Sequence, residues 1–370
     1  MTDAGKEELQ RVAALWDDST RNKERQPLQG WLDSPLVREI CVLPRITSRT
    51  AITWVEAMSE RLGLRSGGTW LSLGCGVAAT EIAAGTRGLF DSLDALDAST
   101  VSLAAARKAA AAAGVSTITF GDVDLNDVRL SESHYDVVMM EMSVHHVREL
   151  ENLLSEILRA LKPDGHLLVN EFIGPRQFQF TDLQLGIVRE FLAVLPRRLR
   201  QDSWTGGLKS EYVRMPIEHW NTVDPSESIR SDEIVPVLES VFDVVLRVDY
   251  GGSVLMLLLE HIIHNFDPGD PNDIEVLRLL TRAEEALIRQ NVIPSDFTMI
   301  AARKRSSLAP HREPEPARRE GATTPPPASD AMAEVLAQRE ALAASVRAIE
   351  AARGWRLARW LWGFVERGRK

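Results

Sequence analysis

The chain has 370 residues, of which 44% are hydrophobic and 26% are charged. These proportions are typical of soluble globular proteins and exclude general disorder. The formal net charge of -10 argues against a protein whose whole surface coats nucleic acid, although a local basic segment is compatible with it.

Cysteine content and apolar runs narrow the class of protein further. The only cysteines, Cys41 and Cys75, are too few for a disulfide framework and lack the spacing of a zinc site, which predicts a reducing, cytoplasmic environment. The first residues, MTDAGKEELQ, are partly acidic and no apolar stretch follows them, so we expect no secretory signal. No window reaches the roughly 18 consecutive apolar residues of a membrane-spanning helix.

The predicted elements begin with a helical lead-in over about residues 1–65. In AITWVEAMSERLG, at residues 51–63, apolar residues recur at helical spacing and Gly63 provides a C-terminal stop. Between about residues 69 and 169, short apolar runs alternate with helical stretches such as STVSLAAARKAAAAAG. This alternation predicts a parallel sheet covered by helices on both faces. The expected strands are TWLSL, SLDAL, STITF, YDVVMM and HLLVN.

The folded body is expected to cover about residues 66–305. A helical stretch, TDLQLGIVREFLAVL, precedes an irregular insertion over about residues 196–240, and irregular segments of that length are usually functional or disordered. FDVVLRVDY and two helical patterns between residues 253 and 291 follow the insertion. The late pattern SDFTMIAARKR is predicted to pair with FDVVLRVDY at the edge of the sheet.

The C-terminal end differs in composition. Residues 306–330 combine proline, alanine and charge without apolar periodicity, which predicts a disordered linker. Residues 331–370 are expected to form a helical tail that ends in RGWRLARWLWGFVERGRK. The tryptophans and basic residues of segment 355–370 suit the surface of an anionic membrane. A partner-docking or self-associating helix is the competing interpretation.

The stretch LSLGCGVAAT, at residues 71–80, is the first candidate for a ligand site. Gly74 and Gly76 follow a predicted strand, where glycine and a helix N-terminus let a ligand approach the backbone closely. A dinucleotide fingerprint needs a third glycine, and alanine stands there at either spacing, as Ala79 or Ala78. The loop alone is therefore also compatible with an ordinary turn.

Two carboxylates follow the next two strands. Asp97 lies about 20 residues beyond the loop, where a carboxylate can accept both ribose hydroxyls of an adenosine. A helix cap is its competing role, which Ser99 can fill equally well. Asp122 follows the third strand and can accept the adenine amine, with an ordinary turn as an equal alternative.

With YDVVMM and LKPDG, this order of parts resembles the class I S-adenosylmethionine-dependent methyltransferases over about residues 70–172. The resemblance implies a Rossmann-like, doubly wound α/β fold with a seven-stranded sheet, an insertion before the sixth strand, and S-adenosylmethionine as cofactor. Segments such as HHVRELE and DPSESIRSDEI further resemble a bacterial subfamily associated with surface-polysaccharide and glycosyltransferase loci. The residues expected to contact the cofactor are Gly74, Cys75, Gly76, Asp97, Ser99, Asp122, Val123, Glu141 and Met142.

The sequence departs from that family at two positions. Ser72 stands where many members carry an acid, which leaves the usual carboxylate contact to the methionine amino group in question. Ala78 replaces the third glycine and is expected to leave the turn intact, since it differs by one methyl group.

The chemistry of methyl transfer selects candidate catalytic residues. Transfer from a sulfonium is an in-line displacement, so the protein must align the acceptor and, for a hydroxyl, remove its proton. His145 and His146, after the fourth strand, are the leading base candidates, with a packed contact at a helix start as the alternative. Glu171, after the fifth strand, can orient a histidine, hold an acceptor hydroxyl or pair with Arg176.

Side chains of the insertion are candidates for an acceptor lid, because aromatic faces and arginine forks suit sugars and phosphates. A packed surface excursion is the alternative for each of them. HIIH, at residues 261–264, places two histidines on one predicted helix face without an accompanying glutamate motif, so no metal site is expected. The lid candidates are Tyr212, Arg214, His219, Trp220 and Arg230.

We therefore expect an S-adenosylmethionine-dependent methyltransferase that acts on a hydroxyl of a sugar or glycan intermediate, with carbon or nitrogen acceptors as alternatives. A NAD-type oxidoreductase shares the glycine loop and Asp97, but the missing glycine and the segments LKPDG and GDVD disfavour it. A non-catalytic scaffold that binds S-adenosylmethionine is the third hypothesis. The expected partners are a small-molecule or glycan acceptor, no nucleic acid, and a membrane or protein that contacts segment 355–370.

Overall fold

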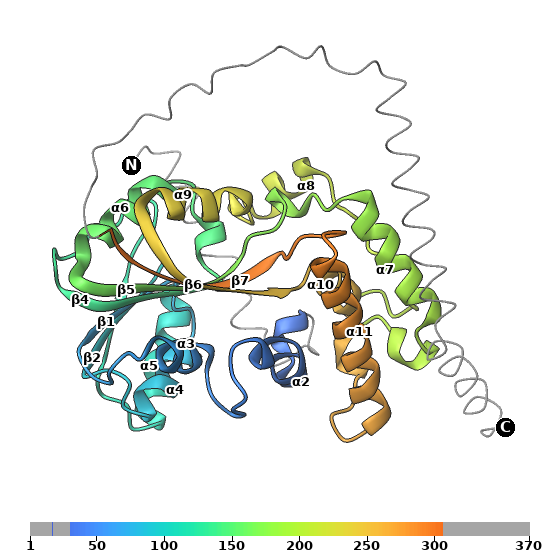
Figure 1. The fold of residues 1–370 in the computed structure, drawn as a ribbon, viewed down its shortest axis with the longest axis horizontal. Coiled ribbons are helices and arrows are strands. Elements are labelled where there is room, and N and C mark those ends of the chain that lie inside the picture. The colour runs from blue at the N-terminus through green and yellow to red at the C-terminus, as the bar shows by residue number, and fades with distance from the viewer. Residues whose placement is uncertain (1–16, 18–29, 306–370) are drawn as a thin grey trace, which may run out of the picture. The chain divides into compact units, whose positions relative to one another are not determined.

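Seven strands of the described chain form one mixed sheet, in the order β3-β2-β1-β4-β5-β7-β6 (Figure 1). Strands β1 to β5 run parallel to one another, whereas β7 is antiparallel to both β5 and β6. This confirms the predicted doubly wound sheet and the pairing of the two late strands. The strands are β1 Thr69–Leu73, β2 Ser92–Asp97, β3 Ile118–Asp122, β4 Tyr135–Glu141, β5 Leu161–Phe172, β6 Phe242–Gly251 and β7 Phe297–Lys304.

The computed structural model describes Asp17 and residues 30–305, which belong to one compact unit of the chain. The predicted linker at 306–330 and the predicted tail at 331–370 lie outside the described residues, as does most of the lead-in before residue 30. The domain boundaries expected there stay predictions.

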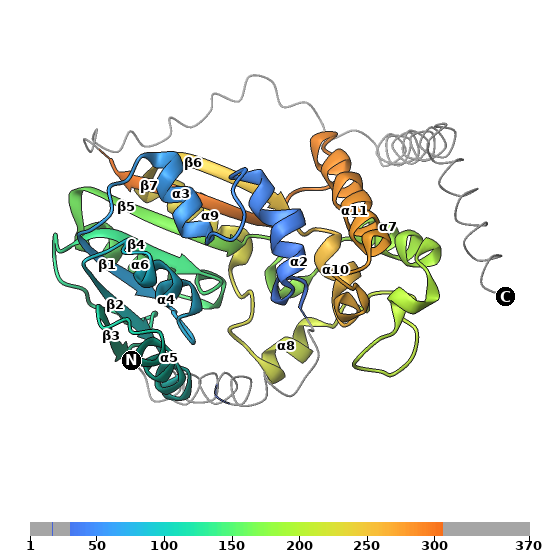
Figure 2. The same cartoon turned by 90° about the horizontal axis from the view of Figure 1, so that it is seen from below.

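Helices cover both faces of the sheet, because successive strand side chains point to opposite sides. Leu71 and Leu73 of β1 pack into the core under α6 and α9, whereas Trp70 packs into the core that α3, α4 and α5 close. Figures 1 and 2 show these two helical layers on opposite faces. The helices are α2 Pro35–Val37, α3 Trp54–Leu62, α4 Ala79–Thr86, α5 Thr100–Ala112, α6 Leu150–Ala160, α7 Asp182–Val194, α8 Ile217–Val223, α9 Ile234–Val241, α10 Leu255–Leu259 and α11 Pro271–Arg289.

Local signals set the ends of several helices. Helix α3 begins at a capping box between Thr53 and Glu56 and ends at Gly63, whose φ of 67° is left-handed. The predicted stop is therefore confirmed. Helix α5 begins at Ser99, whose hydroxyl accepts a hydrogen bond from the Ser102 backbone N–H at 3.0 Å. Ser99, and not Asp97, is the cap of this helix.

Three expectations about local structure are corrected. Strand β5 begins at Leu161, so LKPDG belongs to the strand that it was expected to precede. The insertion contains two helices, α8 in its middle and α9 at its end, and α9 covers the sheet. The two histidines of HIIH do not share a helix face, because α10 ends at Leu259, His261 has a φ of 59° and His264 lies in a separate short turn.

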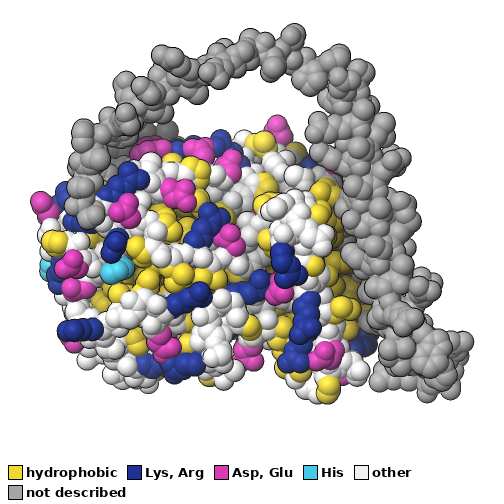
Figure 3. All heavy atoms as spheres, viewed as in Figure 1, with side chains coloured by type: hydrophobic (Ala, Val, Ile, Leu, Met, Phe, Trp, Pro, Cys, Tyr) yellow, Lys and Arg dark blue, Asp and Glu magenta, His cyan; other side chains and the backbone are white. Residues whose placement is uncertain are grey.

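The surface of the described chain is mixed in charge. Figure 3 shows basic and acidic side chains interspersed over one face, with hydrophobic side chains between them. Among the described residues, no helix combines the length and apolar character that crossing a membrane requires.

Candidate active site

The strand order reverses between β1 and β4, which lie side by side at the centre of the sheet. In open α/β sheets, ligands bind beyond the carboxyl ends of the strands at such a point. The glycine loop, Asp97, His145 and Glu171 all follow or end the central strands at this edge. The sheet therefore brings the predicted site residues to one region.

The glycine loop is fastened to the end of β2. The backbone N–H groups of Gly74 and Cys75 donate to the Leu96 carbonyl, at 2.8 and 3.2 Å. Gly74 has a φ of 73°, and a Cβ atom there would lie 2.3 Å from the Cβ of Ser143, so glycine is required by this close approach. Gly76, with a φ of 52°, faces open space. A ligand can approach the backbone at Gly76.

The position of the missing third glycine is strained. Ala78 adopts a φ of 55° immediately before α4 and is fully buried. A left-handed residue other than glycine costs about 1–2 kcal/mol. The turn therefore keeps the glycine-type conformation with alanine, as the sequence predicted. Cys75 lies beside it, and burial raises the pKa of its thiol far above the ordinary value, so it stays protonated.

Two carboxylates stand on neighbouring strands at this edge. Asp97 accepts hydrogen bonds from the backbone N–H groups of Gly76, at 2.7 Å, and Ser99, at 2.8 Å. Its register partner on β3 is Asp122, whose side chain is exposed. Since a carboxylate has about four lone-pair sites, Asp97 can hold the loop and accept further hydroxyl groups. Val123 follows Asp122 in the chain, and its backbone N–H donates to the Asp97 carbonyl at 3.1 Å.

A carboxylate that the sequence analysis missed lies under the loop. The Ser72 hydroxyl donates to Glu81 of α4 at 2.6 Å, and Glu81 is 3% exposed. Burial raises the pKa of Glu81 to about 7. The hydrogen bond from Ser72 lowers this pKa, whereas the nearby Glu141 carboxylate raises it further. The sequence signal that could have identified Glu81 is an acidic residue in the first turn of the helix that follows the glycine loop. Ser72 therefore contacts a carboxyl group that α4 supplies.

Glu141 and Met142 end β4 beside this helix. The Glu141 carboxylate accepts from the Thr80 hydroxyl at 2.7 Å and from the Asn170 amide at 3.3 Å. Met142 has a φ of 50°, and its N–H donates to the Asn170 carbonyl at 2.8 Å. Both residues therefore join the end of β4 to α4 and β5.

Glu171 is fully buried and holds His145. One carboxylate oxygen lies 2.6 Å from Nδ1 of His145, and the other accepts the N–H groups of Ser143 and Val144. Burial alone would lower the pKa of His145, but the Glu171 carboxylate raises it to about 9. Of the three roles considered for Glu171, the structure shows the orientation of a histidine. Arg176 instead pairs with other acids, Asp232 and Glu233.

His146 faces a second acid that the sequence analysis missed, Glu227. Nε2 of His146 lies 4.0 Å from one Glu227 oxygen, and Nε2 of His145 lies 3.7 Å from the other. Burial and the neighbouring His145 lower the pKa of His146. Glu227 lies in the insertion, far along the chain from both histidines, so no local spacing could have predicted this contact.

The aromatic candidates of the insertion connect to His145 through a row of ring contacts. Trp220 packs edge-on against Phe178 at 5.1 Å, Phe178 against Phe172 at 5.2 Å, and Phe172 against His145 at 6.3 Å. His219 packs edge-on against Trp220 at 5.3 Å. The insertion is therefore in contact with the histidines through aromatic rings.

The other lid candidates are engaged within the protein. Arg230 forms ion pairs with Glu151 and Glu233. Arg214 donates to the Phe180 carbonyl at 2.5 Å, and the Tyr212 ring packs edge-on against that of Phe180 at 5.8 Å. The arginines thus stabilise the insertion, and an acceptor lid stays a prediction.

Comparison with known proteins supports the assignment of a class. Residues 71–169 match the model of the methyltransferase domain family. A demethylmenaquinone methyltransferase of Tropheryma whipplei is 28% identical over 173 residues, which cover 46% of this chain and 67% of that protein. A ubiquinone/menaquinone biosynthesis C-methyltransferase of Pseudomonas fluorescens is 28% identical over 103 residues, which cover 28% of this chain and 40% of that protein.

Among solved structures, the [4+2]-cyclase SpnF matches with 17% identity and a TM-score of 0.44, and the match covers 79% of this chain and 94% of that one. The strand order and the glycine loop are those of the Rossmann-like fold of class I S-adenosylmethionine-dependent methyltransferases, and the family match lies within this fold. S-adenosylmethionine is the cofactor of this class. The groups at this edge of the sheet fit it, because the Gly76 backbone has open space beside it and contacts the Asp97 carboxylate, and Asp122 is the register partner of Asp97.

Proposed function

We propose that the protein transfers a methyl group from S-adenosylmethionine to a hydroxyl oxygen of a sugar or glycan intermediate. The observation that carries this proposal is the 2.6 Å contact between Glu171 and Nδ1 of His145. A carboxylate on Nδ1 fixes the orientation of the imidazole, and Nε2 can accept a proton when the ring is neutral, a form that the raised pKa of about 9 restricts to alkaline pH. Trp220 of the insertion, which connects to His145 through Phe178 and Phe172, offers a ring on which a sugar can pack.

The proposed cofactor contacts have distinct roles. The backbone around Gly76 and the N-terminal end of α4 are proposed to bind the methionine end of S-adenosylmethionine, with its carboxylate and amino groups. Asp97 accepts hydrogen bonds from the ribose hydroxyls, and Asp122 accepts one from the adenine amine. Glu81 is proposed to supply the carboxyl group that position 72 lacks. The whole proposed set is Gly74, Cys75, Gly76, Asp97, Ser99, Asp122, Val123, Glu141 and Met142, in which Ser99 acts through its cap of α5.

The sulfonium of the cofactor supplies an electrophilic methyl group. In the proposed step, a hydroxyl oxygen forms a bond to the methyl carbon while the carbon–sulfur bond breaks and its electron pair stays on sulfur. The hydroxyl proton passes to Nε2 of one histidine. His145 is proposed for this role because Glu171 orients it, and His146 is the alternative.

The test uses the purified full chain, methyl-labelled S-adenosylmethionine and glycan intermediates from the cell. Label should appear in a glycan, and His145→Gln should lower the rate by about 10²–10⁴-fold, the usual contribution of a general base. His166→Gln, a half-buried histidine in the first half of β5, is the matched control. Binding of S-adenosylhomocysteine without transfer to any glycan would instead favour the scaffold hypothesis. Selective binding of NAD in calorimetry would favour an oxidoreductase.

A second candidate is methylation of a ring carbon in a phenolic acceptor. The similarity to a demethylmenaquinone methyltransferase over 173 residues and to a ubiquinone/menaquinone biosynthesis C-methyltransferase over 103 residues supports this alternative. A histidine base suits it equally, because removal of the phenolic proton increases the electron density at the neighbouring carbon. Mass spectrometry of the labelled product distinguishes a methyl ether from a carbon-bound methyl group.

Segment 355–370 is proposed to contact an anionic membrane or, alternatively, a protein partner. The interleaved tryptophan and arginine side chains of this segment support the membrane proposal. The segment lies outside the described residues, so its proposed contact depends on the sequence alone. A peripheral location at a cytoplasmic membrane surface belongs to the same proposal.

A further inference from the structure

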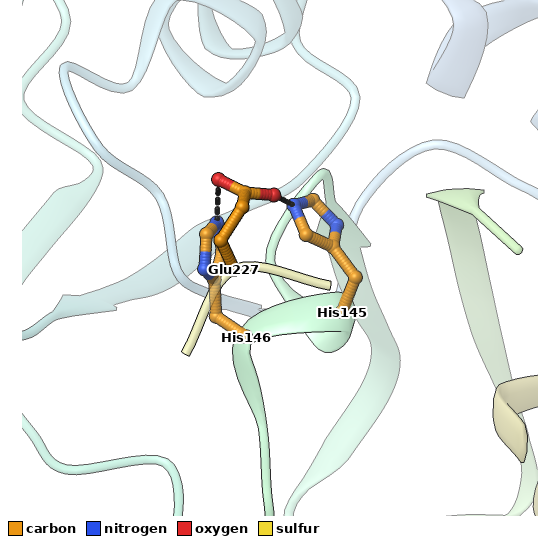
Figure 4. Close-up of side chains that lie close together, drawn as sticks. All are labelled: His145, His146 and Glu227. Carbon is orange, nitrogen blue, oxygen red and sulfur yellow. Dashed lines mark ion pairs between the residues drawn. The ribbon is translucent and has the colours of Figure 1, made fainter. Parts of the chain in front are cut away.

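Three metal-ligating side chains converge beyond the end of β4. The ligand atoms of His145, His146 and Glu227 all lie within 4.8 Å of one another. Figure 4 shows the Glu227 carboxylate facing both imidazole rings, with one oxygen directed at each. The separations of 3.7 and 4.0 Å exceed hydrogen-bond distances. The three groups therefore face one another across a space that a small ion can enter.

Neighbouring groups determine which nitrogen of each ring carries the proton. Nδ1 of His145 lies 2.6 Å from Glu171, whose carboxylate only accepts, so this nitrogen donates. Nδ1 of His146 lies 3.2 Å from the Ser226 hydroxyl, which gives its own hydrogen to Asp224 at 2.6 Å. That Nδ1 must donate as well. In both neutral rings the lone pair is thus on Nε2, the nitrogen directed toward Glu227.

Two nitrogen lone pairs and a carboxylate that face one another repel unless a cation lies among them. A proton on one ring relieves part of this repulsion, whereas a divalent ion interacts favourably with all three groups. Metal-ligating histidines generally donate their other N–H to a carboxylate or a similar acceptor, as both rings do here. We propose that His145, His146 and Glu227 bind one divalent transition-metal ion.

The geometry suits such an ion after a small contraction. Two ligand atoms about 2.1 Å from one ion, at the tetrahedral angle, lie about 3.4 Å apart. The two separations from Glu227, 3.7 and 4.0 Å, exceed this value by a few tenths of an ångström, and no two of the three ligand atoms are more than 4.8 Å apart. The Ser228 hydroxyl holds Glu227 by donating to its carboxylate at 3.1 Å. Each of the three ligands therefore has a hydrogen-bonded support.

The donor set indicates the kind of ion. Two imidazole nitrogens and one carboxylate oxygen suit Zn²⁺, Fe²⁺ and related ions better than Mg²⁺ or Ca²⁺, which prefer oxygen alone. Three protein ligands leave at least one position for a water or substrate oxygen. With an ion bound, Nε2 of each histidine becomes a ligand, and an acceptor hydroxyl would be activated by the ion and not by an imidazole. Metal binding itself does not depend on the proposed methyl transfer.

The experiment measures binding directly on the full chain after removal of any affinity tag and dialysis against a chelator. Zn²⁺ is titrated in competition with a chromophoric chelator, and Co²⁺ serves as the spectroscopic probe. We expect one ion per chain with micromolar or tighter affinity, and a visible Co²⁺ spectrum of low coordination number. Glu227→Gln and His146→Gln should each weaken Zn²⁺ binding by at least about 10-fold, and Ser226→Ala by up to about 10-fold.

His166→Gln is the matched control, because it removes a histidine that lies outside this group, and it should keep the affinity of the parent chain. Circular dichroism and the affinity for S-adenosylhomocysteine show whether each variant is folded. A parent chain without stoichiometric Zn²⁺ or Co²⁺ would overturn the proposal. Unchanged affinity in folded Glu227→Gln and His146→Gln would also overturn it, since the ion would then lie elsewhere. Methyl transfer is measured separately, so either proposal can fail alone.

Discussion

Glu81 provides a quantitative test of how burial under the glycine loop affects the stability of the protein. Burial raises the pKa of its carboxyl group from 4.5 to about 7. Between these values the folded protein keeps a proton that the unfolded chain has lost, so the free energy of unfolding falls as the pH rises through this window. A pKa shift of one unit corresponds to 1.36 kcal/mol, so above about pH 7 the buried carboxylate lowers the free energy of unfolding by about 3 kcal/mol.

Replacing Glu81 with glutamine removes this loss. In the parent chain the Ser72 hydroxyl donates a hydrogen bond to the Glu81 carboxylate at 2.6 Å. The glutamine amide oxygen can accept the same hydrogen bond. We expect Glu81→Gln to be more stable than the parent chain by about 3 kcal/mol at about pH 8, but by only about 1 kcal/mol at about pH 5. Urea denaturation followed by circular dichroism at both pH values measures the difference.

The control is Glu239→Gln, which removes an exposed carboxylate far from the loop and should change stability little at either pH. An equal gain for Glu81→Gln at both pH values would refute the linkage argument, because the benefit would then not come from the charge. A loss of stability at about pH 8 would show that the ionised carboxylate has a favourable partner.

Further expectations concern the cofactor and the tail. Asp97→Asn should weaken S-adenosylhomocysteine binding about 10- to 100-fold in calorimetry, since hydrogen bonds to a charged group contribute about 1.5–3 kcal/mol. Gly74→Ala should cost about 2–4 kcal/mol of stability, because its Cβ would overlap Ser143 and its φ is left-handed. Gly76→Ala should cost only about 1–2 kcal/mol but weaken S-adenosylhomocysteine binding, because its Cβ enters the open space. Removal of residues 331–370 should preserve that binding and abolish sedimentation with anionic vesicles, and an intact chain that ignores vesicles would exclude the membrane proposal.

The strands were predictable because their signal is local. Apolar runs such as YDVVMM and TWLSL mark buried strands directly, and parallel order follows from the helices between them. The register of β5 against β7 was not predictable, because it pairs residues more than a hundred positions apart, as in Asn170 and Met299. The early start of β5 at Leu161 likewise depends on a partner, Tyr135 of β4.

The residues of the candidate site also divide into those that local sequence spacing predicts and those that only tertiary contacts reveal. Gly74, Gly76 and Asp97 follow a spacing that a linear sequence displays, and the sheet brings them together as expected. Glu81 and Glu227 were missed because their importance arises only from tertiary contacts. Glu81 matters because its carboxylate meets Ser72, and Glu227 because the insertion returns to the end of β4.

Glu171 contacts both the residues that pack against the glycine loop and the catalytic candidate His145. This double contact determines how variants of Glu171 should be interpreted. One of its oxygens receives the backbone N–H of Ser143, and Ser143 packs against Gly74 and donates its hydroxyl to the Leu73 carbonyl at 2.9 Å. The other oxygen holds His145. A change at Glu171 therefore disturbs the glycine loop and the histidine together, and lost activity could not be assigned to either. Substitutions at His145 leave the backbone contacts of Glu171 in place, so they are the cleaner test of proton removal.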